Sequence, residues 1–310
     1  MRLRNLLCSA LALCCTPALW AEQFYQVWAP GVSEEGGWYD YNKTTINEGY
    51  RADTGMCWAY SASNVIAWWQ NHNADTLTAN GITAPQNEQI VNTFVGVYKN
   101  IGFWPSAAYE WWIKGTGDLV TGNVNEYGFS NYVDWETIEP KDKDTSAVEM
   151  ELGLTGFNIN TLASGGILKD AYKDSMTIIF GVNYNNNPFA FAEAIIQAIK
   201  DGYALSLSVD QAHAYTLWGV EYKETDQGLM ITKAWITDSD DLNNTGSGLV
   251  PKDVAYQVKE GTPGLYFAEN AGAVWANLAG IRTTQIMPEP STSILTLMAL
   301  AGLALRRRRS

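Results

Sequence analysis

The distribution of apolar and polar positions divides the chain into a helical first part and a β-rich second part. In TGMCWAYSASNVIAWW, apolar residues recur at spacings of four, three, one and three from Trp58 to Trp69, which predicts a helix with one apolar stripe. Asp53 or Thr54 is the expected N-cap of that helix. The same criteria predict further helices over residues 86–100, 106–114 and 188–201.

Strands are predicted to dominate after residue 202. One β-rich run covers residues 203–209, a last strand is expected near 264–267, and two aromatic and β-branched runs flank the turn signal ETDQG. These two runs predict an antiparallel hairpin. For loops of two to four residues, the numbers of paired residues add up to about 451–454, so His213 is expected to face the stretch from Asp238 to Asp241.

The two ends of the chain predict targeting segments. Residues 1–21 have the build of a secretory signal peptide, with two arginines, an apolar run and small residues before the cleavage site, which is expected after Ala21 or Ala18. Between the two ends, residues 22–286 have a length that suits one large domain or two small ones.

The C-terminal segment, residues 287–310, contains Pro-Glu-Pro, an apolar run of 12 residues and four arginines. A helix that spans a membrane needs about 20 apolar residues. The segment resembles the PEP-CTERM sorting tail of Gram-negative bacteria. That resemblance implies contact with a sorting machinery and the membrane, and a final location at the cell surface, in the outer envelope or in the medium. A short membrane anchor held by its basic flank is the alternative.

Acidic residues outnumber basic ones in the body of the protein. Without the two terminal segments the chain holds 14 Lys and Arg and 32 Asp and Glu, a net charge of −18. A nucleic-acid partner is therefore not expected, because binding to phosphates requires a basic face. The 13 tryptophans of the chain are expected in the core more often than along a ligand cleft.

Cys57 is the single cysteine outside the predicted signal peptide, so no internal disulfide is expected. If Thr54 caps the helix, Cys57 lies in the first turn. There the unpaired backbone N–H groups and the positive end of the helix dipole stabilise a thiolate and a developing oxyanion. This position favours a catalytic nucleophile, and a small buried apolar residue is the alternative.

Two histidines are available as a general base, His72 and His213. His72 follows Cys57 by 15 residues in the same helix, a distance of about 22 Å, and is expected to be a solvated residue at the helix C-terminus. His213 is therefore the candidate base, and a carboxylate facing it across the hairpin would orient the imidazole. The alternative is a core histidine beside a solvated acidic turn.

No metal or organic cofactor is expected. Asp241, Asn243, Thr245 and Gly246 match the first positions of a calcium loop, but Lys252 stands where the loop requires a bidentate glutamate. One cysteine and two distant histidines do not form a zinc site. The chain also contains no G-x-S-x-G, Walker or G-x-G-x-x-G motif.

Four motifs occur in the order GWYDYNK at 37–43, CWAYSASNVIAWW at 57–69, HAYTLWG at 213–219 and TDSD at 237–240, a span of about 200 residues. Together and in this order they resemble the IdeS/Mac family of streptococcal immunoglobulin-cleaving cysteine peptidases.

The resemblance implies a role for five residues. Cys57 would be the nucleophile, His213 the general base and acid, Asp238 the residue that orients His213, and Asp240 a second supporting carboxylate. Lys43 would stabilise the oxyanion together with the Cys57 N–H, and an ordinary surface lysine is the alternative for Lys43.

The resemblance also implies the fold and the activity. The expected fold class is α+β, a papain-like cysteine peptidase fold in which a helical lobe with the cysteine helix packs on an antiparallel sheet lobe. The expected activity is that of an exported cysteine endopeptidase that hydrolyses protein substrates through a Cys-His-Asp triad and an acyl-enzyme. Two alternatives stay open: a catalytically inactive papain-like surface adhesin or binding protein, and an acyl-transferring, transglutaminase-like enzyme.

Overall fold

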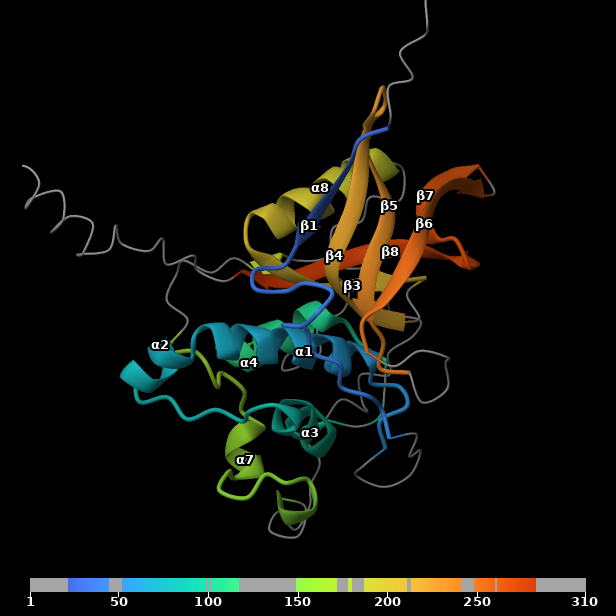
Figure 1. The fold of residues 1–310 in the computed structure, drawn as a ribbon. Helices are drawn as coiled ribbons and strands as arrows, with labels where there is room; N and C mark the ends of the chain where they lie inside the picture. The colour runs from blue at the N-terminus through green and yellow to red at the C-terminus, as the bar shows by residue number, and fades with distance from the viewer. Residues whose placement is uncertain are drawn as a thin grey trace, which may run out of the picture.

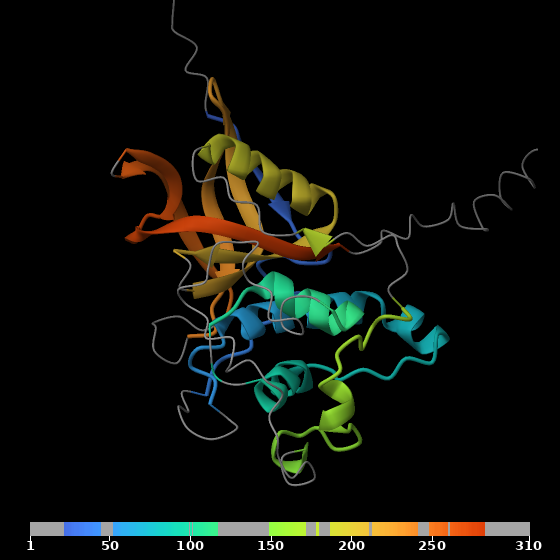
Figure 2. The same cartoon turned by 180° about the vertical axis from the view of Figure 1, so that it is seen from behind.

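The computed structural model describes residues 22–44, 52–98, 100, 102–116, 149–171, 178–179, 187–210, 213–240, 248–259 and 261–282. Figures 1 and 2 show a helical layer and a β layer, with one further helix on the far side of the strands. The expected signal peptide, the C-terminal segment and the calcium-loop positions 241–246 lie outside the described residues. The division of the chain into three parts therefore stays a prediction.

The helices whose bounds fall within the described residues are α1 Cys57–His72, α2 Ala74–Ala79, α3 Glu88–Val97, α4 Pro105–Lys114, α7 Ile159–Leu162 and α8 Pro188–Lys200. The helices predicted over 86–100, 106–114 and 188–201 are confirmed as α3, α4 and α8. Helix α8 begins as its sequence indicates, because Asn187 Oδ1 accepts a hydrogen bond from Ala190 N at 3.0 Å and Pro188 occupies the first turn. No described helix has the length and apolar character needed to cross a membrane.

Helix α1 is buried on all sides, which differs from the single apolar stripe that its sequence predicts. Of its 16 residues, 14 are buried. One face contacts the strands, and another contacts α3 and α4. A helix covered on all sides has no solvated face, so its polar residues must find partners inside the protein.

The helical layer is held together by aromatic side chains around α1. Trp58 packs against Phe94 and Phe103, each with ring centroids 5.7 Å apart. Phe94 also packs against Trp111 and Trp112, with centroids at 5.1 and 5.4 Å. All three tryptophans have no measurable solvent exposure. These tryptophans therefore form core, as the composition indicated, and do not line a cleft.

The β layer consists of β1 Phe24–Trp28, β2 Ile178–Ile179, β3 Tyr203–Val209, β4 His213–Thr225, β5 Gly228–Thr237, β6 Val250–Lys259, β7 Thr262–Phe267 and β8 Asn270–Arg282. Six of these strands follow one another in the order β4-β3-β8-β7-β6-β5, and β5 pairs back with β4. All of the pairings are antiparallel. Strand β1 extends the assembly along β4, and β2 pairs with β8.

The predicted papain-like fold, a helical lobe packed on a sheet lobe, is wrong. The strands form a closed six-stranded antiparallel barrel accompanied by helices. Closure depends on β6 and β8, which the strand pattern did not predict. Strand β8 alone joins β3 to β7, and without it the remaining strands would form an open sheet with two free edges.

The barrel wall lies between two apolar cores. Alternate residues of a strand face opposite sides. On β3, Ala204 belongs to the core around α1, whereas Leu205 and Leu207 belong to the core shared by the barrel and α8. On β4, Trp218 belongs to the core around α1, and Leu217 belongs to the core shared by the barrel and α8. Burial on both sides explains why every residue of β3 is buried, including Ser206 and Ser208, which alternate with apolar residues.

Gly219 is a position where the packing leaves no space for a side chain. It pairs with Trp28 across β1 and β4, and a Cβ atom on Gly219 would lie 2.6 Å from Trp28 Cε3. The Trp28 ring is also packed against Trp235, with centroids 4.5 Å apart. We expect Gly219→Ala to lower the free energy of unfolding by about 1–3 kcal/mol through overpacking, as measured by urea denaturation.

Gly36→Ala is the matched control, because a Cβ atom there meets nothing within 4 Å. A Gly219→Ala protein as stable as Gly36→Ala would contradict the predicted crowding.

Candidate active site

Cys57 is the first residue of α1, directly after the N-cap residue Met56. The Met56 carbonyl accepts hydrogen bonds from Ala59 N at 2.9 Å and Tyr60 N at 3.2 Å. The Cys57 N–H lies ahead of these bonds and has no acceptor within the helix. The first turn of α1 therefore presents both the thiol and a backbone donor at the helix end where the dipole favours negative charge.

The turn before α1 differs from the predicted cap. Neither Asp53 nor Thr54 is the N-cap residue. Asp53 is buried, and its Oδ2 accepts hydrogen bonds from Thr44 N at 2.7 Å, Thr44 Oγ1 at 2.8 Å and Tyr60 Oη at 2.7 Å. Asp53 thus ties Thr44 to the start of the helix.

The Cys57 thiol is free and only 8% exposed. Burial by itself would raise the pKa of this thiol. The hydrogen bond with His213, the positive charges of His213 and Lys43, and the backbone amide of Ala214 outweigh burial and lower the pKa of Cys57 below its ordinary value. The surroundings therefore favour the thiolate.

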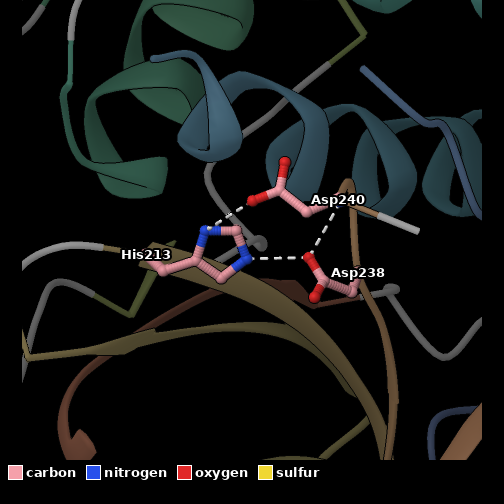
Figure 3. A group of neighbouring side chains, drawn as sticks. All are labelled: His213, Asp238 and Asp240. Carbon is pink, nitrogen blue, oxygen red and sulfur yellow. Dashed lines mark hydrogen bonds and ion pairs between the residues drawn. The ribbon is translucent and has the colours of Figure 1, made fainter. Parts of the chain in front are cut away.

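His213 is the first residue of β4, and its imidazole lies between two carboxylates (Figure 3). Nε2 is 2.7 Å from Asp238 Oδ1, and Nδ1 is 3.6 Å from Asp240 Oδ2. Burial by itself would lower the pKa of His213. The hydrogen bonds with Asp238 and Cys57, and the negative charges of both partners, raise the pKa of His213 to about 10. At neutral pH the ring therefore carries both protons.

The hairpin of β4 and β5 brings the imidazole and the carboxylates together. The predicted hairpin is confirmed, with a two-residue loop at 226–227 and a pairing of Thr216 with Thr237 that falls inside the predicted range. His213 precedes Thr216 on one strand, and Asp238 follows Thr237 on the other. Beyond the last paired residues the two side chains therefore face each other.

Asp238 is the carboxylate in direct hydrogen-bond contact with the imidazole. Its Oδ1 also accepts a hydrogen bond from Asp240 N at 3.0 Å, which turns the chain after β5 back toward His213. Burial would raise the pKa of Asp238, but the hydrogen bond and charge of His213 lower it below its ordinary value. Asp238 is therefore ionised at neutral pH and opposite in charge to the imidazolium.

Lys43 is buried in the same site. Its Nζ donates to the Thr54 carbonyl at 3.0 Å and forms an ion pair with Asp240 Oδ1 at 2.5 Å. Its backbone N–H donates to the Ser239 carbonyl at 2.8 Å. With 5% of its surface exposed, Lys43 is a residue of the site and not an ordinary surface lysine.

His213, Asp238 and Asp240 are also the types of residue that bind metal ions, and their donor atoms lie within 4.8 Å of one another. In this arrangement the nitrogen and oxygen atoms that could bind a metal already have other partners. His213 Nε2 donates a hydrogen bond to Asp238, and Asp240 forms an ion pair with Lys43. Because a metal requires an unprotonated imidazole nitrogen, the geometry fits proton transfer better than metal binding.

The structure thus brings together all five residues that the sequence singled out: Cys57, His213, Asp238, Asp240 and Lys43. His72 lies at the opposite end of α1, where it is exposed and its Nδ1 is 2.8 Å from the Trp68 carbonyl oxygen.

Sequence reasoning missed the polar residues that join α1 to the hairpin. Ser61 donates to Ser206 Oγ at 2.7 Å, and Asn64 donates to Thr216 Oγ1 at 3.0 Å. A signal for both was present in the sequence. Cys57, Ser61 and Asn64 follow one another at spacings of four and three, which places all three on one face of the helix.

Comparison with known families finds a relationship in the N-terminal part of the chain. Residues 21–101 match the Mac-1 (Mac 1) family model. This is the domain of the IdeS/Mac family, so the match relates the chain to the IdeS-like cysteine peptidases. A search of curated proteins finds no match.

The match corrects the family assignment made from motifs. That assignment combined an IdeS/Mac-like peptidase spanning about 200 residues with a PEP-CTERM tail. The family model covers Lys43 and Cys57 but ends at residue 101, before His213 and the TDSD motif, and it gives no support to a PEP-CTERM assignment for residues 287–310. The combined assignment is therefore wrong, and the supported relationship is a Mac-1 domain at 21–101.

Proposed function

We propose that this protein is a cysteine endopeptidase that cleaves protein substrates through an acyl-enzyme. The observation that carries the proposal is the contact between the Cys57 thiol and the His213 imidazole, from segments 156 positions apart in the chain. The third group is Asp238, at 2.7 Å from the other ring nitrogen. Nucleophile, base and orienting group in this order are what nucleophilic catalysis requires.

The acylation step follows from these contacts. Because Nε2 of His213 is bound to Asp238, Nδ1 is the nitrogen that remains for Cys57. The Cys57 thiolate attacks the carbonyl carbon of the scissile amide, and the carbonyl π electrons move to oxygen. When the tetrahedral intermediate collapses, the C–N bond breaks and the leaving amine takes the Nδ1 proton of His213.

Deacylation reverses the roles. His213, now neutral, removes a proton from a water molecule that attacks the thioester carbon. The C–S bond breaks, the acid product leaves, and the thiolate and imidazolium are restored. Asp238 keeps the ring oriented and stabilises its positive charge in both half-reactions.

The oxyanion is proposed to be stabilised by the start of α1. The Cys57 N–H is a backbone donor at the positive end of the helix dipole. Lys43 adds a buried positive charge close enough to lower the pKa of Cys57. In the absence of substrate, Lys43 Nζ is bound to Asp240 and to the Thr54 carbonyl.

Export is proposed on the basis of the signal-peptide pattern of residues 1–21, and a protein is the proposed substrate. The incubation of the purified protein with a mixed proteome, followed by sequencing of new N-termini, tests the activity. The proposal requires new termini that disappear after alkylation of Cys57. Products that carry an added amine would instead indicate acyl transfer, and no new termini would contradict the peptidase.

The pH dependence of Cys57 alkylation by iodoacetamide provides a test that needs no substrate. The pKa of Cys57 is lowered and that of His213 raised to about 10, so the thiolate persists well below the ordinary thiol pKa of about 8.5. We expect the alkylation rate at pH 6 to stay near its value at pH 8. A rate that falls about tenfold per pH unit below pH 8 would contradict the thiolate–imidazolium pair.

A further inference from the structure

One buried amide contacts three segments of the candidate site. Asn64 on α1 is 1% exposed. Its Oδ1 accepts a hydrogen bond from Tyr41 N at 2.9 Å, and its Nδ2 donates to Thr216 Oγ1 at 3.0 Å and to Thr237 Oγ1 at 3.4 Å. Both threonines are also fully buried. Both amide hydrogens and the amide oxygen therefore have partners inside the protein.

The directions of these hydrogen bonds follow from their chemistry. The Tyr41 N–H can only donate, so the amide oxygen must face it and the NH₂ group must face the two hydroxyls. Each hydroxyl then donates onward to a backbone carbonyl: Thr216 to Ser61 at 3.3 Å and Thr237 to Tyr39 at 2.9 Å. A network with one consistent set of directions holds its members in one arrangement.

Each of the three residues that contact the Asn64 side chain lies within three positions of a residue of the site. Tyr41 lies two positions before Lys43, Thr216 three positions after His213, and Thr237 directly before Asp238. Asn64 itself follows Cys57 by seven residues, which places both on one face of α1 about 10 Å apart. The amide thus connects the helix that carries the thiol to the strands that carry the imidazole and carboxylate.

We propose that Asn64 is a positioning residue that sets the distance between the Cys57 thiol and the His213 imidazole. This inference rests on the proposed function, because it concerns the same pair of groups. Without the amide, α1 and the β4–β5 hairpin would keep their apolar contacts and the Ser61 hydrogen bonds but lose the bonds to Thr216 and Thr237, which lie nearest the catalytic ends of both strands. A displacement of about 1 Å is enough to weaken a hydrogen bond of about 3 Å and to impair catalysis.

The same helix offers a matched control in Gln70. Gln70 is also a buried amide, 1% exposed, with two hydrogen bonds. Its Nε2 donates to the Pro85 carbonyl at 2.8 Å, and its Oε1 accepts from Trp112 Nε1 at 3.3 Å. Both partners belong to the helical layer. Loss of this amide removes similar interactions from α1 without touching the hairpin.

The test compares Asn64→Leu with Gln70→Met in the purified protein, since both substitutions replace an amide by an apolar group of similar shape. We expect both to lower the unfolding midpoint, and only Asn64→Leu to change the chemistry of Cys57. Iodoacetamide alkylation of Asn64→Leu at pH 6 should be about tenfold slower than in wild type, because the fraction of Cys57 present as thiolate at this pH should fall about tenfold. Gln70→Met should keep the wild-type pH profile.

Smaller changes test the same network if Asn64→Leu fails to fold. Thr216→Val removes the hydroxyl and keeps the shape, and it should slow alkylation at pH 6, whereas Thr216→Ser should restore the wild-type rate. A wild-type alkylation profile in both Asn64→Leu and Thr216→Val would overturn the positioning role and leave the proposed function intact. An ordinary thiol profile in the wild-type protein would contradict both proposals.

Discussion

Cys57→Ala and His213→Ala are each expected to reduce substrate cleavage by about 10⁴-fold or more. Without Cys57 no acyl-enzyme forms, and without His213 neither the thiolate is stabilised nor the leaving amine protonated. The measurement is the rate of appearance of new N-termini in a proteome digest. The unfolding midpoint of each variant should stay within a few degrees of wild type, because the apolar core around α1 is unchanged.

His72→Ala is the matched control for His213→Ala. His72 is the other histidine of the chain and lies exposed at the far end of α1. We expect the His72→Ala protein to cleave substrate at the wild-type rate. Cleavage by Cys57→Ala or His213→Ala at a rate near that of His72→Ala would refute the assignment of nucleophile and base.

Asp238→Ala is expected to lower kcat/KM by about 10²- to 10⁴-fold and to change the pH profile. The hydrogen bond with Asp238 and its negative charge raise the pKa of His213. Activity of the wild-type protein is lost as the pH rises through the His213 pKa of about 10. In Asp238→Ala this basic limb should move to lower pH, because the imidazolium gives up its proton more easily. Kinetics from pH 5 to 11 measure both effects.

Asp226→Asn provides the control for Asp238→Ala. Asp226 is an exposed carboxylate in the turn of the same hairpin, at the end away from the site. Its replacement should change neither the rate nor the pH limb. If Asp238→Ala kept the wild-type basic limb, Asp238 would not be the group that controls the protonation of His213.

The ion pair of Lys43 with Asp240 gives the resting site a second layer of charge compensation. Asp240 lies near His213 Nδ1 and binds the Lys43 ammonium. The thiolate and the Asp240 carboxylate are thus both close to the same two positive groups. The negative charges are those of Cys57, Asp240 and Asp238, and the positive charges are those of His213 and Lys43. Because each charged group has a partner of opposite charge, this many ionised groups can occupy a largely buried volume.

Local patterns in the sequence were sufficient for most helices and for the geometry of the hairpin. The period of three to four residues located α1, α3, α4 and α8. The turn length predicted the register of β4 and β5, and two register shifts that offset each other preserve it at Thr216 and Thr237, so the approach of His213 to Asp238 was predictable. The position of Cys57 at the start of a helix was predictable from the helical period of apolar residues that begins at Trp58. Each of these features depends on residues that are neighbours in the chain or joined by one tight turn.

Only the tertiary structure decided how these parts assemble. Strand β8 is rich in Ala, Asn and Gly, residues with low strand propensity, and becomes a strand because it fits between β3 and β7. Its pairing closes the barrel and makes the predicted two-lobed fold wrong. The burial of α1 on all sides and the place of Lys43 beside Asp240 likewise depend on contacts between distant segments. A sequence determines local periods and turns directly, whereas closure and burial depend on which surfaces meet, and many pairings fit the same local pattern.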